Sequence, residues 1–211
     1  MKTLKTLCLG MVAAAMLLTG CNSMTNTGKG ALIGGGIGAA IGTAVGAGAG
    51  TLIGNRMDKQ KKELEKSLAN ADVETVQDQN GLAAIKVTFP GGILFPTNGT
   101  TLSASAQTEL AQFAASLKQN PETNVQIFGF TDNTGGMEVN TRIANGRALS
   151  VDRFLVDSGI APTRLSYQGI PMADYVASND TPAGRAQNRR VEIYITANQQ
   201  MIQQAEQGTL K

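Results

Sequence analysis

The chain contains no histidine and no tryptophan among its 211 residues. Without histidine it cannot form a serine-histidine triad, a histidine-ligated zinc or haem site, or an imidazole acid-base centre. Its two cysteines, Cys8 and Cys21, both lie at the N-terminal end, so no disulfide framework or cysteine metal cluster can form in the body of the chain. These absences exclude many classes of catalytic site. We therefore expect a protein that is not an enzyme and has no cofactor.

Residues 1–20 read as an export signal. Lys2 and Lys5 provide the positive end, and the apolar stretch that follows is too short to be a stable membrane span. The segment ends in Leu-Thr-Gly before Cys21, which resembles a bacterial lipobox. That resemblance implies that the chain is cut before Cys21 and that lipid is attached to this residue. The alternative is an ordinary signal peptide with an incidental cysteine.

Removal of residues 1–20 changes what the charge indicates. The segment contains two lysines and no acidic residue, so the mature chain keeps 16 basic and 16 acidic side chains and has no formal net charge. A neutral chain argues against nucleic acid as a partner. Several acyl chains on Cys21 would give a stable membrane anchor. Asn22, where lipoproteins kept at the inner membrane favour Asp, points by resemblance to outer membrane lipid as the partner and to a domain facing the periplasm.

A short tether, residues 21–29, leads into an uncharged segment, residues 30–54, in which glycine recurs at every fourth position without a gap. On a helix this spacing makes a flat groove beside a row of mostly aliphatic side chains, and such small-xxx-small patterns suit close helix packing in membranes. The segment resembles the glycine zippers of bacterial envelope lipoproteins. It predicts membrane-associated helix packing and a possible homo-oligomer, and the competing interpretation is a flexible Gly-Ala spacer.

Residues 55–71 mix lysines with acidic residues, while Met57, Leu64 and Leu68 recur at helical spacing. We expect an amphipathic connecting helix here. Contact with anionic lipid headgroups is one interpretation, and a solvated connector is the simpler one.

The periodicities of residues 72–197 predict a compact α+β domain of order β-α-β-α-β-β. Strands are expected at 85–89, 124–130, 164–168 and 191–196, and helices from about Ser103 and at 139–158. The glutamine-rich tail, residues 198–211, is expected to be disordered.

Two features of this domain suggest chemistry. The segment Thr131-Asp132-Asn133-Thr134-Gly135-Gly136 follows a predicted strand, where ligand groups are often presented, although an Asx-type turn explains it equally well. Arg147 lies in the apolar stripe of the predicted helix 139–158. Either its side chain snorkels to the surface, or it is partly buried and paired with an anion.

The motifs resemble those of the peptidoglycan-binding domain at the C-terminus of OmpA and its lipoprotein relatives. They are Gly129-Phe-Thr-Asp-Asn-Thr-Gly135, then Asn140, Arg147-Ala148, and Gly184-Arg-Ala-Gln-Asn-Arg-Arg-Val191. Together with the lipobox and the glycine zipper, they make nearly the whole chain similar to YiaD-type outer-membrane lipoproteins.

This resemblance implies a mixed sheet with helices on one face. It also implies recognition of diaminopimelate in the peptide stem of peptidoglycan. By motif position, Asp132 would receive the ammonium group of this zwitterion and Arg147 its carboxylate. Thr131 and Asn140 match flanking positions that orient the ligand or the loop, and Arg189 matches a position near the site. The function implied is a lipid-anchored, non-catalytic tether between the outer membrane and peptidoglycan. The alternative is an oligomeric membrane assembly, driven by the glycine zipper, that uses wall binding only for its localisation.

The chain departs from the family pattern in two places. Gly146 precedes Arg147 within the predicted helix, which should loosen that helix near the site. Pro96 follows Phe95 where the family often has aspartate, which puts a hydrogen bond from this loop in doubt. Neither change removes the charges of Asp132 and Arg147.

Overall fold

A computed structural model describes residues 45–96 and 98–210. They contain a five-stranded sheet of order β1-β2-β5-β3-β4, in which β3 and β4 pair in parallel and all other neighbours are antiparallel. The predicted mixed sheet is therefore confirmed. The strands are β1 (Asp72–Gln77), β2 (Ala83–Pro90), β3 (Thr123–Phe130), β4 (Leu165–Ile170) and β5 (Arg190–Ala197).

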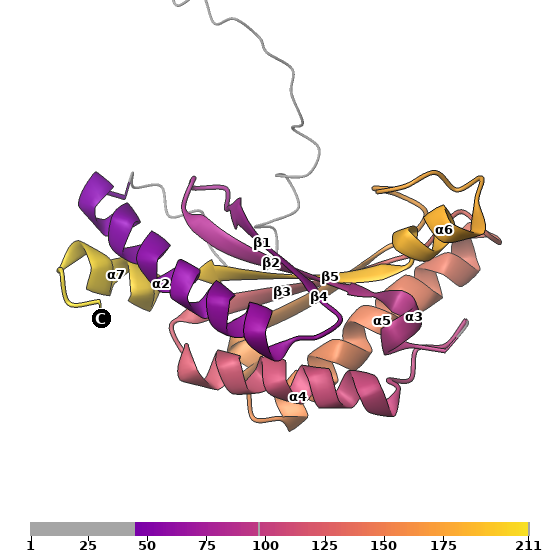
Figure 1. The fold of residues 1–211 in the computed structure, drawn as a ribbon, viewed down its shortest axis with the longest axis horizontal. Helices are drawn as coiled ribbons and strands as arrows, with labels where there is room; N and C mark the ends of the chain where they lie inside the picture. The colour runs from indigo at the N-terminus through magenta and orange to yellow at the C-terminus, as the bar shows by residue number, and fades with distance from the viewer. Residues whose placement is uncertain (1–44, 97, 211) are drawn as a thin grey trace, which may run out of the picture.

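Helices α2, α4 and α5 lie on the same side of the sheet, as Figure 1 shows. The helices of the described part are α2 (Ala47–Ser67), α3 (Gly91–Leu94), α4 (Ala104–Gln119), α5 (Met137–Asp157), α6 (Pro182–Asn188) and α7 (Gln199–Glu206), with a 3-10 turn, η1, at Pro162–Arg164. The predicted order β-α-β-α-β-β is confirmed from β2 to β5. Sequence patterns missed β1, an edge strand with mostly exposed side chains, and the short helices α3 and α6.

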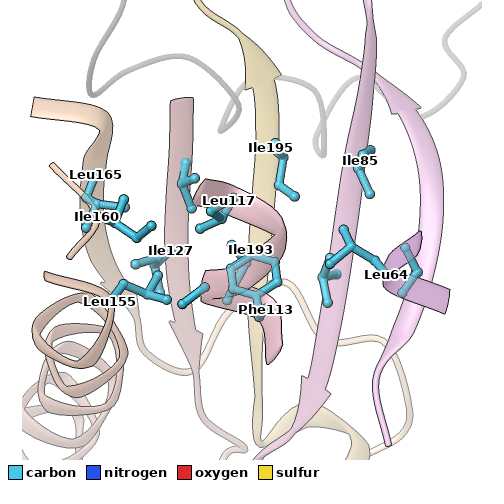
Figure 2. Packing of buried hydrophobic residues seen from close by; sticks show 14 of the residues in the cluster. Leu64, Ile85, Phe113, Leu117, Ile127, Leu155, Ile160, Leu165, Ile193 and Ile195 are labelled. Carbon is cyan, nitrogen blue, oxygen red and sulfur yellow. The ribbon is translucent and has the colours of Figure 1, made fainter. Parts of the chain in front are cut away.

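The main core fills the space between the sheet and these helices. Alternate residues of β2, β3 and β5 point to the helical face because side chains alternate across a strand. Figure 2 shows Phe113, Leu117 and Leu155 of the helices packed against Ile127 and Ile193 of the sheet, and all five are inaccessible to solvent. The start of α4 is capped as expected, since the Ser103 hydroxyl accepts a hydrogen bond from the Ala106 N–H at 3.1 Å.

The segment from residue 47 to residue 67 is a single helix, α2, that belongs to the folded domain. Ile53, Met57 and Leu64 are at most 1% exposed and join the main core. The Arg56 guanidinium pairs with Glu122 at 2.8 Å. The expected amphipathic helix is therefore present, but it is packed on the domain and is not a solvated connector. The apolar residues at helical spacing are buried against the domain itself.

The C-terminal tail also differs from the prediction of disorder. Helix α7 places Met201, Ile202 and Ala205 in the main core, and it lies beside α2 (Figure 1). Asn198 caps this helix by accepting a hydrogen bond from the Met201 N–H at 3.0 Å. Three apolar side chains on one face of a short helix outweigh a glutamine-rich composition, because the helix is stabilised by packing and not by its own propensity.

The predicted signal peptide, Cys21, the tether and most of the glycine segment lie outside the described residues. The C-terminal end of that segment is visible in α2, where Ala49 and Ile53 are buried in the domain. A Cβ atom added at Gly46, Gly50 or Gly54 would meet nothing within 4 Å, so the glycine row faces away from the core. Among the helices of the described part, none has the length and apolar content needed to cross a membrane.

The burial of α2 predicts that this helix contributes to the stability of the domain. Ile53→Ala should lower the free energy of unfolding by about 2–5 kcal/mol, because it removes methyl groups from a fully buried position. Urea unfolding of the chain from residue 22 measures this. Lys59→Ala, at an exposed position of the same helix, is the control and should change stability by less than about 0.5 kcal/mol. Equal stabilities of the two variants would contradict the docking of α2.

Candidate functional site

The turn that follows β3 presents a buried carboxylate. Asp132 is 5% exposed, and its Oδ1 atom accepts a hydrogen bond from the Thr134 N–H at 2.8 Å. Gly135 continues the turn with φ of +88°, a conformation that favours glycine. The local structure is thus the Asx-type turn that the sequence allowed, and it also places the Asp132 side chain just beyond the C-terminal end of β3.

Arg189 supplies the countercharge. Its Nη1 atom lies 2.5 Å from the Asp132 Oδ2 atom, and it comes from the residue directly after α6. Gly91 donates its N–H to the Arg189 carbonyl at 2.7 Å, and a Cβ at position 91 would collide with that carbonyl. Burial acts to raise the pKa of Asp132, but the hydrogen bonds from Thr134 and the Arg189 guanidinium outweigh it and hold the pKa below its usual value.

Arg147 is a buried cation without an acidic partner. It is 3% exposed, so the snorkelling interpretation is wrong. Its Nε atom donates to the Gly99 carbonyl at 3.1 Å, and its guanidinium carbon lies 5.3 Å from the centre of the Phe95 ring. Among the residues that the structure describes, no carboxylate lies within 4.0 Å of this guanidinium, although Asp132 acts on it electrostatically.

The electrostatics of Arg147 favour an added anion. Burial lowers the pKa of this side chain first, repulsion from Arg189 lowers it further, and attraction to Asp132 opposes both. Arginine nevertheless keeps its proton in proteins. With two guanidinium groups and one carboxylate, this part of the molecule has an excess positive charge that a carboxylate or another planar anion can neutralise.

The two departures from the family pattern are resolved by this geometry. Gly146 lets α5 approach the loop before α4, since a Cβ at position 146 would lie 2.8 Å from the Thr100 side chain. The Ser150 hydroxyl holds the same loop through the Thr100 carbonyl at 2.6 Å. The doubted contact from the loop after Phe95 is present, because the Gly99 backbone provides it without an aspartate.

Thr131 and Asn140 hold the turn in place. The Asn140 amide donates to the carbonyls of Thr134 and Gly136 at 2.9 and 3.1 Å, which ties the turn to the first part of α5. The Thr131 hydroxyl accepts a hydrogen bond from the Met172 N–H at 3.0 Å, which connects the turn to the long loop before α6. Both side chains are buried, and they bear on the site by orienting the loops around Asp132.

Sequence reasoning missed other residues that build the site. Asn188 is fully buried and lies inside the motif quoted above, so the motif itself was the available signal. Phe95 and Gly99 gave none, because their contacts with Arg147 exist only after the chain folds. Arg185 and Arg190 hold the long loop through the carbonyls of Asn179 and Asp174 at 2.7 and 3.0 Å.

The site offers charged and hydrogen-bonding groups and no metal-binding set. No cluster of three or more possible metal ligands occurs among residues 45–96 and 98–210. A buried guanidinium, a carboxylate held ionised and an excess positive charge suit the binding of a small polar ligand that carries at least one carboxylate.

Comparison with known proteins agrees with this architecture. Residues 94–189 match the OmpA family, and residues 18–61 match a family described as a glycine zipper. The chain is 34% identical over 143 residues to the probable lipoprotein YiaD of Escherichia coli, across 68% of this chain and 64% of YiaD. It is 38% identical over 113 residues to the peptidoglycan-binding protein ArfA of Mycobacterium tuberculosis, across 54% of this chain and 35% of ArfA.

A solved structure supports the same assignment. The cell wall anchor of the type VI secretion system from Pseudomonas aeruginosa is 26% identical, with a TM-score of 0.56, and the match covers 68% of this chain and 98% of the anchor. The chain spans less than two thirds of the length of the two curated relatives above. Residues 94–189 are therefore similar to the OmpA family, and residues 18–61 are similar to the glycine zipper family.

Proposed function

We propose that the domain binds peptidoglycan without turnover, by recognising the zwitterionic end of diaminopimelate in the peptide stem. The observation that carries this proposal is Arg147, a buried guanidinium with no acidic partner among the described residues, close to the ionised Asp132. A ligand carboxylate would pair with Arg147 through its planar donor fork, and a ligand ammonium would lie against Asp132. The names of ArfA and of the cell wall anchor support this ligand class.

Binding suits these groups better than catalysis. A general acid or base works best when its pKa lies near the operating pH. The pKa of Asp132 is instead held below its usual value by Thr134 and Arg189, although burial opposes this shift. An ionised carboxylate that is already hydrogen-bonded is a stable electrostatic contact for a cation and a poor proton donor at neutral pH.

We further propose that lipid on Cys21 anchors the chain in the outer membrane, so that the protein tethers this membrane to peptidoglycan. The lipobox sequence before Cys21 supports the anchor, and so does the similarity to the probable lipoprotein YiaD. Because α2 is docked on the domain, residues 22–44 connect the proposed lipid anchor on Cys21 to the folded domain.

The proposed contacts of Asp132 and Arg147 with the ligand predict that replacing either residue weakens binding. Asp132→Asn and Arg147→Lys should each weaken binding to purified diaminopimelate-type peptidoglycan at least about tenfold, because Asp132→Asn removes the charge that pairs with the ligand ammonium and Arg147→Lys loses the planar donor fork that holds the ligand carboxylate. Cosedimentation with the chain from residue 22 measures this. Arg142→Ala, which removes an exposed arginine from the same helix, is the matched control and should bind like the wild type.

The ligand itself is tested by changing the wall. Peptidoglycan with lysine in place of diaminopimelate lacks the second carboxylate, so wild-type protein should bind it poorly. Equal binding to both walls, with Asp132→Asn and Arg147→Lys folded and unaffected, would sink the proposed recognition. Circular dichroism spectra establish that each variant is folded.

The lowered pKa of Asp132 also predicts how stability depends on pH. A carboxylate whose pKa is lower in the folded state stabilises that state above its ordinary pKa of 3.8, and this contribution disappears as the pH falls through the folded-state pKa. The stability difference between wild type and Asp132→Asn should therefore be largest at pH 6 and shrink toward pH 3. Urea unfolding at both pH values measures it, and a difference that grows on acidification would contradict the assigned ionisation.

A second candidate function is self-association through residues 30–54. It is favoured by the open glycine row at Gly46, Gly50 and Gly54, where a side chain would meet nothing within 4 Å. A second helix could approach closely there, as small residues at spacing four allow. Wall binding would then serve only to place the assembly.

A deletion separates the two functions, provided that it spares α2. Removing residues 30–44, which contain four of the seven glycines of the row, should weaken self-association of the lipidated chain in detergent and leave wall binding unchanged, because Ile53 and the rest of the α2 core remain. Sedimentation velocity and the wall cosedimentation assay measure the two properties. Loss of both would show that the segment and the domain do not act separately, and unchanged self-association would remove this second candidate.

A further inference from the structure

The loop between β4 and α6, residues 171–181, is held in an unusual conformation. Met172 and Asp174 both have φ of +50°, which is uncommon for residues other than glycine and persists only where the surroundings enforce it. Gly184 lets α6 lie directly against this loop, since a Cβ there would overlap the Ser178 carbonyl oxygen. The Arg185 guanidinium fixes the same loop through the Asn179 carbonyl at 2.7 Å.

Asn188 makes the largest set of contacts with this loop. Its Oδ1 atom accepts hydrogen bonds from the N–H groups of Val176 and Ala177 at 2.8 and 3.1 Å. Its Nδ2 atom donates to the Ala177 carbonyl at 2.8 Å and to the Asn179 Oδ1 atom at 3.0 Å. A side-chain amide has two donor hydrogens and two acceptor lone pairs, and here all four are used in a fully buried position.

The loop in turn reaches the site on both sides of Asp132. The Met172 N–H donates to the Thr131 hydroxyl at 3.0 Å. On the other side, the Asn133 N–H donates to the Asn179 Oδ1 atom at 3.4 Å, the same atom that Asn188 holds. A continuous path of hydrogen bonds therefore runs from Asn188 through Asn179 to the backbone of the turn that carries the carboxylate.

We propose that Asn188 is a positioning residue for the wall-binding site: acting through Asn179, it fixes the backbone at Asn133 and thereby holds the Asp132 carboxylate in its binding orientation. This inference rests on the proposed function. It also gives a reason for the adjacent residues of the motif, because Asn188 holds the turn and Arg189 pairs with the carboxylate that the turn presents. Neighbouring residues thus fix one ligand-binding group in two ways.

A purely structural role for Asn188 is the competing explanation, and it predicts different results. A residue that only stabilises the fold would lower the melting temperature when replaced, with little effect on the affinity of the molecules that remain folded. A positioning residue changes the affinity and the environment of Asp132 in the folded protein. Its effect should also depend on Asn179, because residues that act along one path are not additive.

The experiment is a double-mutant cycle in the chain from residue 22, with a soluble diaminopimelate-containing wall fragment as the probe. Titration calorimetry measures the affinity of Asn188→Ala, Asn179→Ala and the double variant. We expect each single variant to bind about tenfold more weakly and the double variant to bind no more weakly than Asn188→Ala. Ser178→Ala is the matched control, since its hydroxyl contacts only Asp180 in the same loop and the substitution should leave affinity unchanged.

A second measurement does not depend on wall binding. A carboxyl-carbon NMR titration follows the pKa of Asp132, which should rise toward its ordinary value in Asn188→Ala and Asn179→Ala as the turn loosens. Wild-type affinity and wild-type Asp132 pKa in both folded variants would overturn the positioning role. If Asn188→Ala does not fold, Asn179→Ala decides the question, because Asn179 is only half-buried. A wild-type chain that does not bind the probe would refute the proposed function. The NMR titration of Asp132 would still test the positioning role of Asn188.

Discussion

Arg147 is a permanently charged side chain placed among apolar neighbours, and much of the surrounding structure is arranged to accommodate it. A buried ion without a partner is costly, and the cost is reduced here by a backbone carbonyl and an aromatic ring. Both contacts come from the segment after β2. Gly146 and Ser150 on α5 bring that segment close, so one helix carries the cation and the groups that position its neutral partners.

The carboxylate opposite Arg147 is held by a different set of elements. Asp132 follows β3, a strand in the middle part of the sheet, and its turn is tied to α5 by Asn140 and to the long loop by Thr131. Arg189 reaches it from the end of α6. In the proposed binding mode the two opposite charges contact one ligand from separate elements, so rigid supports would keep their separation fixed. A fixed pair of this kind reduces the ordering cost of binding.

The helices outside the OmpA-family match, α2 and α7, also have a structural role. Helices α2 and α7 lie side by side and bury apolar side chains against the domain, although one is charged and the other is rich in glutamine. The row of residues that contains Ala49 and Ile53 is part of the domain core, whereas the glycine row beside it stays open. One helix thus serves the domain with one face and leaves the zipper face free.

The strands β2 to β5, helices α4 and α5, and the candidate residues Asp132 and Arg147 could be picked out from the sequence, because alternation, helical spacing and a short motif are local signals. The clearest of these was a cation in the apolar stripe of a helix, although the sequence left open whether it is buried or snorkels. Whether Arg147 pairs with an acid, where Phe95 and Gly99 lie and why Gly146 is needed could not be predicted. Those contacts join residues about 50 positions apart.

The same distinction explains the wrong predictions. Residues 55–71 and the tail were judged by charge and composition, but each helix is stabilised by a partner surface that other parts of the chain create. The sequence by itself determined the pattern of strands β2 to β5 and of helices α4 and α5, the glycine spacing and the charges that the domain carries. Only the tertiary structure decided which charges remain unpaired and which apolar faces are covered, because pairing and burial depend on segments that meet only in the folded chain.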